Sequence, residues 1–447
     1  MVDVERELQT MLHERADTVR VSPDLKDRIQ GRVRRSRRTP RRFVAAAAVA
    51  AALVASTGAV AVISDRGHPA SSVRVGPQPT TPATIGHRTG TPILVPPNGW
   101  AVIAEPPATD AFASVWTGNQ LVVAFRGPPM RFASYQPQFN AWTSIPDPPV
   151  SVVATFTDSS TFVWTGTTVL VWGYESTGAD TFSGTLHLLA YQPTSNTWRQ
   201  LADPPITQLI QAHPIWTGHE LIVWGGNFNG DNAPAQGAIY NPTTNQWRRI
   251  ATSPLSTREN PMIVWTGHEM IAWGGYTANA EAAQPLTAAD RLEGAAYDPT
   301  TNTWRPLPPS GLPTLSLVTA VWTGHEMIVL SPPSNGAAYD PTTNRWRRIA
   351  ASPLTSREQS AWAWTGRELI VWGGIQFTNG RQTLADGAAY DPTTNQWRLL
   401  PKAPIGSRDG ATMGWTGTVA IIAGGDGPSS PNSPSEPPAR HAAAYRP

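Results

Sequence analysis

From about residue 98 onward, short apolar runs alternate with polar turns, and the pattern recurs every 42–57 residues. Each unit has a Trp-Thr-Gly triplet, an apolar run such as ELIVWGG (220–226), a variable polar stretch and a segment such as GAAYDPTTNQWRLL (387–400). Gly and Pro/Asn turn signals divide each unit into four short strands. Because one such sheet cannot bury both of its faces alone, the units are expected to stack radially, each covering the next.

The number of turns and hairpins predicts how the ring closes. Trp-Thr-Gly occurs seven times, but a Tyr precedes a Trp by seven residues only six times, and the last unit stops at a third strand around Tyr445. Residues 98–103 match the fourth-strand segment 245–250 in Asn, Trp and Ile. We therefore expect an all-β, seven-bladed propeller whose last blade is completed by residues 98–103, because an open ring would leave strand edges unpaired.

The Trp content follows the same repeat, which makes inter-blade packing its simplest interpretation. The 19 Trp residues divide into seven in Trp-Thr-Gly triplets (116, 164, 216, 265, 322, 364, 415), seven in fourth strands (100, 142, 198, 247, 304, 346, 397), four at the ends of second strands (172, 224, 273, 372), and Trp362.

The first 97 residues read differently from the repeats. Residues 1–42 have amphipathic helical spacing and a net charge of +5, and residues 43–63 carry no charge over 21 positions. A helix of that length spans a bilayer, and the seven Arg just before it place residues 1–42 in the cytoplasm and the propeller outside. Residues 64–97 read as a Pro/Ser/Thr-rich linker. A cleaved signal peptide, which would give a secreted protein, and a buried Ala-rich helix are the alternatives.

Charge and cysteine content exclude several classes of protein. Residues 43–447 carry a net charge of −3, so the basic pI belongs to the tail and no nucleic-acid partner is expected for the main domain. The chain has no Cys, which excludes disulfide scaffolds, Cys-ligated metals and thiol nucleophiles.

An apolar strand ending in Gly-Gly, followed by a Tyr and then a Trp at fixed spacing, resembles the kelch repeat over residues 98–447. Two units depart from the pattern, with Phe125-Arg126-Gly127 in the first and Val329–Pro332 in the fifth. The resemblance implies a kelch-like β-propeller. It also implies that the loops from strand four to strand one and from strand two to strand three share a face that binds the partner or substrate.

Three of the loops from strand four to strand one contain an Arg followed by an acid. Arg suits carboxylates, phosphates and sugar hydroxyls because of its planar fork. Alternatively, each Arg pairs with an acid of a neighbouring blade and holds the blades together. The ligand-binding candidates are Arg258, Glu259, Arg357, Glu358, Arg408 and Asp409.

No catalytic set, metal site or cofactor is expected. The His-Glu pairs at 219–220, 268–269 and 325–326 sit in the same turn of different blades, so they radiate around the ring and cannot share one zinc ion. The copper cofactor of galactose-oxidase-type kelch propellers requires a Cys. Kelch-like sugar epimerases need no metal and remain an alternative.

These observations favour a monomeric, membrane-tethered, extracytoplasmic propeller that binds an envelope protein or glycan. The alternatives are a non-redox, epimerase-like enzyme acting on carbohydrate, and a transmembrane sensor that signals through residues 1–42.

Overall fold

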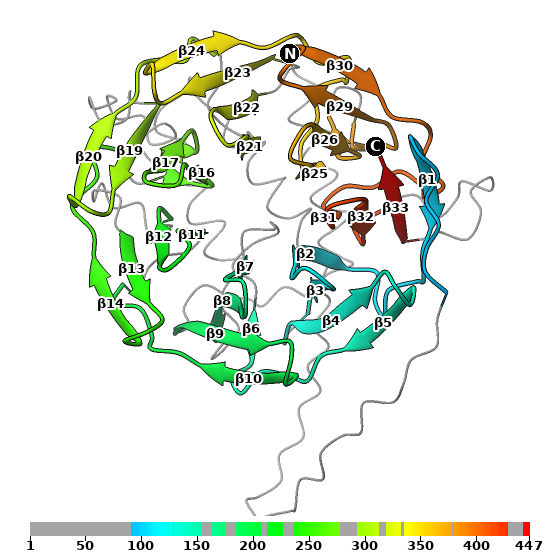
Figure 1. Cartoon of the computed structure of the whole chain (residues 1–447), viewed down its shortest axis with the longest axis horizontal. Coiled ribbons are helices and arrows are strands. Elements are labelled where there is room, and N and C mark those ends of the chain that lie inside the picture. The colour runs from blue at the N-terminus through cyan, green and yellow to red at the C-terminus, as the bar shows by residue number, and fades with distance from the viewer. Residues whose placement is uncertain are drawn as a thin grey trace, which may run out of the picture. The chain divides into compact units, whose positions relative to one another are not determined.

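A computed structural model describes residues 91–127, 129–153, 162–175, 185–206, 212–226, 237–256, 258–277, 293–312, 319–331, 335–377, 380–427 and 441–447. Within those ranges every regular element is a β-strand. The described strands form seven antiparallel sheets arranged as the blades of a ring (Figure 1). The prediction of an all-β, seven-bladed propeller is therefore confirmed.

The first four blades follow one another along the chain. Blade one is β2 (Ala111–Trp116), β3 (Leu121–Phe125), β4 (Arg131–Gln136) and β5 (Ala141–Ser144). Blade two is β7 (Phe162–Trp164), β8 (Val169–Glu175), β9 (Leu186–Gln192) and β10 (Thr197–Gln200), with β6 (Val152–Val153) added to β8. Blade three is β11 (His213–Trp216), β12 (Leu221–Trp224), β13 (Gly237–Asn241) and β14 (Gln246–Arg249). Blade four is β16 (Met262–Trp265), β17 (Met270–Trp273), β19 (Gly294–Asp298) and β20 (Thr303–Pro306).

The remaining three blades complete the ring. Blade five is β21 (Thr319–Trp322), β22 (Met327–Ser331), β23 (Asn335–Asp340) and β24 (Arg345–Arg348). Blade six is β25 (Ala361–Trp364), β26 (Leu369–Trp372), β29 (Gly387–Asp391) and β30 (Gln396–Leu399). Blade seven is β31 (Thr412–Trp415), β32 (Ala420–Ala423), β33 (Ala442–Arg446) and β1 (Gly99–Val102). Two short pairs lie outside the blades: β15 (Arg258–Glu259) with β18 (Tyr276–Thr277), and β27 (Ile375–Gln376) with β28 (Gln382–Thr383).

Blade seven closes the ring as the strand count predicts. β1 pairs antiparallel with β33, with Trp100 opposite Tyr445. The two ring centroids are 4.8 Å apart, and the Trp100 indole Nε1 donates a hydrogen bond of 2.8 Å to the carbonyl of Pro401, just after β30 of blade six. The start and the end of the propeller sequence therefore share one sheet (Figure 1).

The segments expected before the propeller lie mostly outside the described residues. This holds for the helical tail at 1–42, the membrane helix at 43–63 and most of the linker at 64–97. At the end of that linker, the backbone N–H of Ile93 donates to Pro137 of blade one, and Val95 is buried. Among the residues that the structure describes, no helix has the length and hydropathy to cross a membrane.

The structure shows why the turn between strands one and two contains Thr and Gly. In blade four, the hydroxyl of Thr266 accepts a hydrogen bond from the backbone N–H of Glu269 (2.9 Å) and donates to the carbonyl of Glu269 (3.1 Å). Gly267 has φ of 103°, a backbone conformation that glycine adopts without steric cost. A hydroxyl and a glycine in sequence therefore close the turn between strands one and two.

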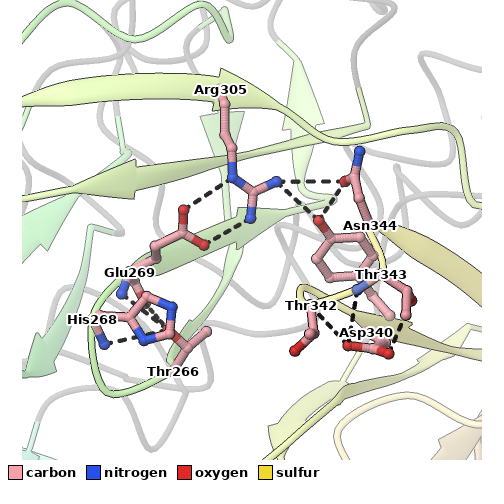
Figure 2. A network of polar contacts seen from close by, with 9 residues as sticks. Thr266, His268, Glu269, Arg305, Asp340, Thr342, Thr343 and Asn344 are labelled. Carbon is pink, nitrogen blue, oxygen red and sulfur yellow. Dashed lines mark hydrogen bonds and ion pairs between the residues drawn. The ribbon is translucent and has the colours of Figure 1, made fainter.

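The Tyr and Asn of each hairpin meet at the turn between strands three and four. In blade five, Asn344 takes a positive φ of 54°, which Asn tolerates better than most residues, and its Oδ1 accepts a 2.7 Å hydrogen bond from the Tyr339 hydroxyl. The carboxylate of Asp340 accepts from the backbone N–H of Thr342 and from the Thr343 hydroxyl (Figure 2). The same Tyr-to-Asn bond is present in each of the seven described blades.

The core lies between blades, and at four of the seven interfaces two Trp rings contact each other in a tilted arrangement. Trp224 of β12 faces Trp304 of β20 with ring centroids 5.5 Å apart, and Trp273 and Trp346 repeat the contact at 5.6 Å. In addition, the indole N–H of every fourth-strand Trp donates to a carbonyl just after the fourth strand of the preceding blade. These bonds run from Trp100 to Pro401, Trp142 to Ala104, Trp198 to Pro146, Trp247 to Ala202, Trp304 to Ala251, Trp346 to Pro308 and Trp397 to Ala350.

The glutamates of the His-Glu pairs hold fourth-strand arginines. The carboxylate of Glu269 accepts hydrogen bonds from Nε (2.9 Å) and Nη2 (2.7 Å) of Arg305 (Figure 2). This bidentate contact raises the pKa of the guanidinium. Nη1 of Arg305 also donates a hydrogen bond of 3.0 Å to the hydroxyl of Tyr339 in the next blade. Glu220 and Glu326 form the equivalent ion pairs within blades three and five, so the His-Glu pairs are repeated turn residues, as their position in the repeat predicts.

Candidate functional site on the loop face

The connections between strands divide the propeller into two faces. The turn face carries the Trp-Thr-Gly turns and the turns between strands three and four, and the loop face carries the two-to-three and four-to-one connections. All six candidate residues precede or begin a first strand, so they belong to the loop face.

The three candidate arginines bind backbone carbonyls of their own blades. Each guanidinium donates to the carbonyl of the glycine sixteen residues later, where the chain leaves strand two with a positive φ of about 70°. This turn leaves a carbonyl without a strand partner, and the Arg supplies the missing donor. The bonds are Arg258 to Gly274 (3.0 Å), Arg357 to Gly373 (3.1 Å) and Arg408 to Gly424 (3.0 Å).

Burial of these arginines follows from that role. Arg258 is 1% exposed and Arg408 is 2% exposed. Arg357 also forms an ion pair of 2.9 Å with Asp386, which belongs to the blade that Arg357 introduces rather than to a neighbouring blade. The backbone carbonyl of Arg408 accepts from Gly374 of the preceding blade, so the backbone rather than the side chain joins the two blades here.

Asp409 is a buried carboxylate at the centre of a charged cluster. Its side chain is 4% exposed, and both of its oxygens accept hydrogen bonds of 3.0 Å from Nη2 of Arg381. Arg381 lies between β27 and β28, in the two-to-three connection of blade six. Burial, reinforced by the charge of Asp426, raises the pKa of Asp409, and Arg381 opposes this shift.

Two further charges extend the cluster into blade one. Asp409 and Asp426 pair through their backbones in an antiparallel bridge, with N–H to carbonyl distances of 3.0 and 2.8 Å. The carboxylate of Asp426 lies 3.5 Å from Nη1 of Arg126, which follows β3. Arg381, Asp409, Asp426 and Arg126, hereafter the charged row, therefore place two aspartates between two arginines across blades six, seven and one.

The two candidate glutamates occupy different parts of this face. The backbone of Glu358 pairs with Ile375, and burial raises the pKa of its carboxyl. The next residue, Gln359, accepts a hydrogen bond of 2.9 Å from the backbone N–H of Gly410, which brings the Glu358 loop against the Asp409 loop. Glu259 pairs through its backbone with Tyr276 in blade four, away from this junction.

Sequence reasoning identified Asp409 but missed its partners. Arg381 and Asp426 lie in two-to-three connections, which have no repeat pattern to mark individual residues. Arg126 did carry a signal, because it stands where the repeat usually has a glycine after the second strand. A charged residue that breaks a glycine pattern was therefore the available evidence for this part of the cluster.

The described residues contain no cluster of three or more His, Cys, Asp or Glu side chains arranged to hold a metal ion. The comparisons with known proteins found no matching family model and no matching curated protein.

Proposed function

We propose that the protein is a membrane-tethered, kelch-like binding module of the cell envelope that takes a protein or glycan ligand on its loop face. A β-propeller is commonly a protein-binding module. Functions on this fold reside in its loops, while the blades supply a rigid scaffold.

The charged row is the observation that carries the proposal. The side chain of Asp426 is 61% exposed, Arg381 is 35% exposed and Arg126 is 29% exposed, so their charges reach solvent from a rigid base. A row of two aspartates flanked by two arginines selects ligands by electrostatic complementarity. Arg408, next to Asp409 in sequence, donates to the carbonyl of Gly424, two residues before Asp426, and so holds these two loops together.

The tether rests on the sequence. The uncharged segment 43–63 follows seven Arg and precedes a Pro-rich stretch, which orients a single span with the propeller outside. Because the chain has no Cys, a single introduced cysteine reports topology cleanly. A membrane-impermeant maleimide on intact cells should label Lys402→Cys, on the exposed surface of the propeller, and leave Ser36→Cys in the tail unlabelled. Labelling of Ser36→Cys alone would reverse the orientation.

Binding is tested with the full-length chain in detergent, immobilised and exposed to envelope extract and to a glycan array. Asp426→Lys changes an exposed charge of the row and should lower retention of the ligand about tenfold or more, because charge reversal replaces attraction with repulsion. Arg345→Asp, at an exposed position in β24 on another blade, is the matched control and should bind as the native chain does. Equal retention by Asp426→Lys and the native chain would rule out the charged row as the binding surface.

A second candidate is a non-redox enzyme acting on carbohydrate. The observation in its favour is the raised pKa of Asp409 beside a second carboxylate, the arrangement that acid–base catalysts use. The bidentate pair with Arg381 occupies both oxygens of Asp409, which favours binding over proton transfer. Epimerisation of sugars that the array retains, followed by NMR and lost in Asp409→Asn, would establish the enzyme instead.

A further inference from the structure

A groove of about 520 Å³ opens on the turn face between blades six and seven. This volume falls within the range of small-ligand pockets. Blade six contributes four of the lining residues and blade seven six. The lining consists of Thr365, Arg367, Glu368 and Arg398 from blade six, and Asn98, Trp415, Gly417, Thr418, Arg446 and Pro447 from blade seven.

The repeat shows that two arginines at this groove are departures from the pattern. Arg446 follows Tyr445, whereas the residue after the corresponding Tyr is aspartate in blades four, five and six. Arg367 follows Trp-Thr-Gly in blade six, where blades three, four and five have histidine. The aspartates are Asp298, Asp340 and Asp391, and the histidines are His219, His268 and His325.

A structural duty explains the aspartates but not the arginine. Asp340 and Asp391 accept hydrogen bonds from the backbone of the turn between strands three and four. In blade seven, strand four is β1, from the other end of the propeller sequence, so no such turn joins it to β33. The residue at position 446 therefore has no turn backbone to accept hydrogen bonds from, and an arginine there needs another explanation.

The three arginines of the groove differ in how far they are neutralised. Arg398 is held by Glu368 through two hydrogen bonds and by the hydroxyl of Tyr445 (2.7 Å). Arg367 has a side chain that is 79% exposed, with a single 3.5 Å contact to Asp391. Arg446 is exposed, and no ion pair to it occurs among the described residues. Two largely unneutralised guanidiniums therefore face one groove from two blades.

The rest of the lining indicates the kind of anion. Thr365, Thr418 and Asn98 are polar, Trp415 and Pro447 offer the apolar surface, and no Leu, Ile, Val, Met or Phe side chain lines the groove. A peptide of acidic character would find no pocket for apolar side chains. A sugar ring, with its hydroxyls and apolar CH faces, matches polar groups beside an indole, and a carboxylate matches the Arg forks.

We propose that this groove binds an acidic saccharide of the uronate class, with a carboxylate held by Arg367 and Arg446 across the interface between blades six and seven. The site lies on the turn face and is independent of the loop-face ligand. A saccharide held there contacts both blade six and blade seven, so binding also stabilises the interface between these two blades by mass action.

The test uses the full-length chain in detergent and a trigalacturonate probe, measured by isothermal titration calorimetry at low ionic strength. The fully methyl-esterified trimer is the matched ligand control, because it keeps the rings and removes the charge. The native chain should bind the acid at least about tenfold more tightly than the ester, and the difference should shrink in high salt. Equal affinity for acid and ester would overturn the proposal.

Matched variants come from the repeat itself. Arg446→Asp and Arg367→His install residues that other blades carry at these positions, so they preserve the fold while each should weaken acid binding about tenfold. Arg345→Asp makes the same charge change as Arg446→Asp on β24 and should bind like the native chain. Arg446→Ala repeats the measurement if the aspartate lowers the melting temperature.

Three outcomes decide between the sites and the ligand classes. Native-like binding by Arg446→Asp would overturn the site. Tighter binding of a hexaglutamate peptide than of the trimer, with the same sensitivity to Arg446→Asp, would overturn the saccharide assignment. Unchanged uronate affinity in Asp426→Lys is expected, and a loss there would place the saccharide on the loop face and overturn the groove.

Discussion

The two faces of the propeller use their side chains in opposite ways. On the turn face, one set of contacts recurs around the ring, with Tyr to Asn, fourth-strand Trp to a carbonyl of the preceding blade and, in blades three to six, Glu to Arg. On the loop face, the charged row occurs at one place and joins three particular blades. Repeated contacts fix the angle between blades, whereas contacts that occur once create a distinctive surface.

The acids of the two faces differ in the same sense. At Asp340, burial acts to raise the pKa, but hydrogen bonds from Thr343 and Thr342 outweigh it and lower the pKa below its ordinary value. At Asp409, burial dominates and the pKa is raised. Hydrogen bonds on the turn face thus favour the charged form of Asp340, while burial on the loop face disfavours the charged form of Asp409. Carboxylates with a raised pKa are common at functional sites.

Removing the closing strand should have the largest effect, because the repeated contacts of the turn face depend on a closed ring. Deletion of residues 98–104 takes away β1 and leaves β33 with an unpaired edge, so the domain should unfold. Trp100→Ala should cost less than about 3–5 kcal/mol, the range for a fully buried large aromatic, because Trp100 is only partly buried. Circular dichroism and chemical denaturation measure both, with Trp142→Ala in blade one as the matched control. A stably folded deletion product would contradict the closure of the ring by β1.

Removing one hydroxyl from the repeated contacts should have a smaller effect that depends on the blade. Tyr135→Phe loses a single hydrogen bond to Asn140 and should cost about 1 kcal/mol. Tyr339→Phe loses the bond to Asn344 and also the acceptor of Arg305, so it should cost about 1.5–3 kcal/mol. Denaturation midpoints compare the two variants. Equal losses would show that the arginine link contributes nothing to the interface.

The smallest effect is a difference in the sign of pH dependence. Asp340, with a lowered folded pKa, binds fewer protons folded than unfolded, so the native chain should gain stability over Asp340→Asn as pH rises towards about 4. Asp409, with a raised folded pKa, binds more protons folded, so the native chain should lose stability relative to Asp409→Asn as pH rises above about 4. Urea denaturation from acid to neutral pH measures both differences, and trends of the same sign would refute the contrast between the faces.

The blades were predictable because their pattern is local. Trp-Thr-Gly and the Tyr-to-Trp spacing mark strands and turns whose hydrogen bonds lie within a few residues, as at Thr266 and Glu269. Closure followed from counting, since an unpaired third strand at Tyr445 requires the partner that Trp100 supplies. The arginines of the four-to-one loops were placed on the correct face, but their bonds to glycine carbonyls followed from backbone geometry that the residue types alone do not reveal.

The sequence by itself determined the number of blades, the order of strands and the closing strand, because these depend on periodic patterns and on the need to pair every edge. Only the tertiary structure decided which charges meet. Arg126 and Asp426 are 300 residues apart and join because blades one and seven are neighbours in the ring. Arg367 and Arg446 share a groove because blades six and seven are neighbours. Such contacts depend on curvature and on loops without periodicity, and no local pattern encodes them.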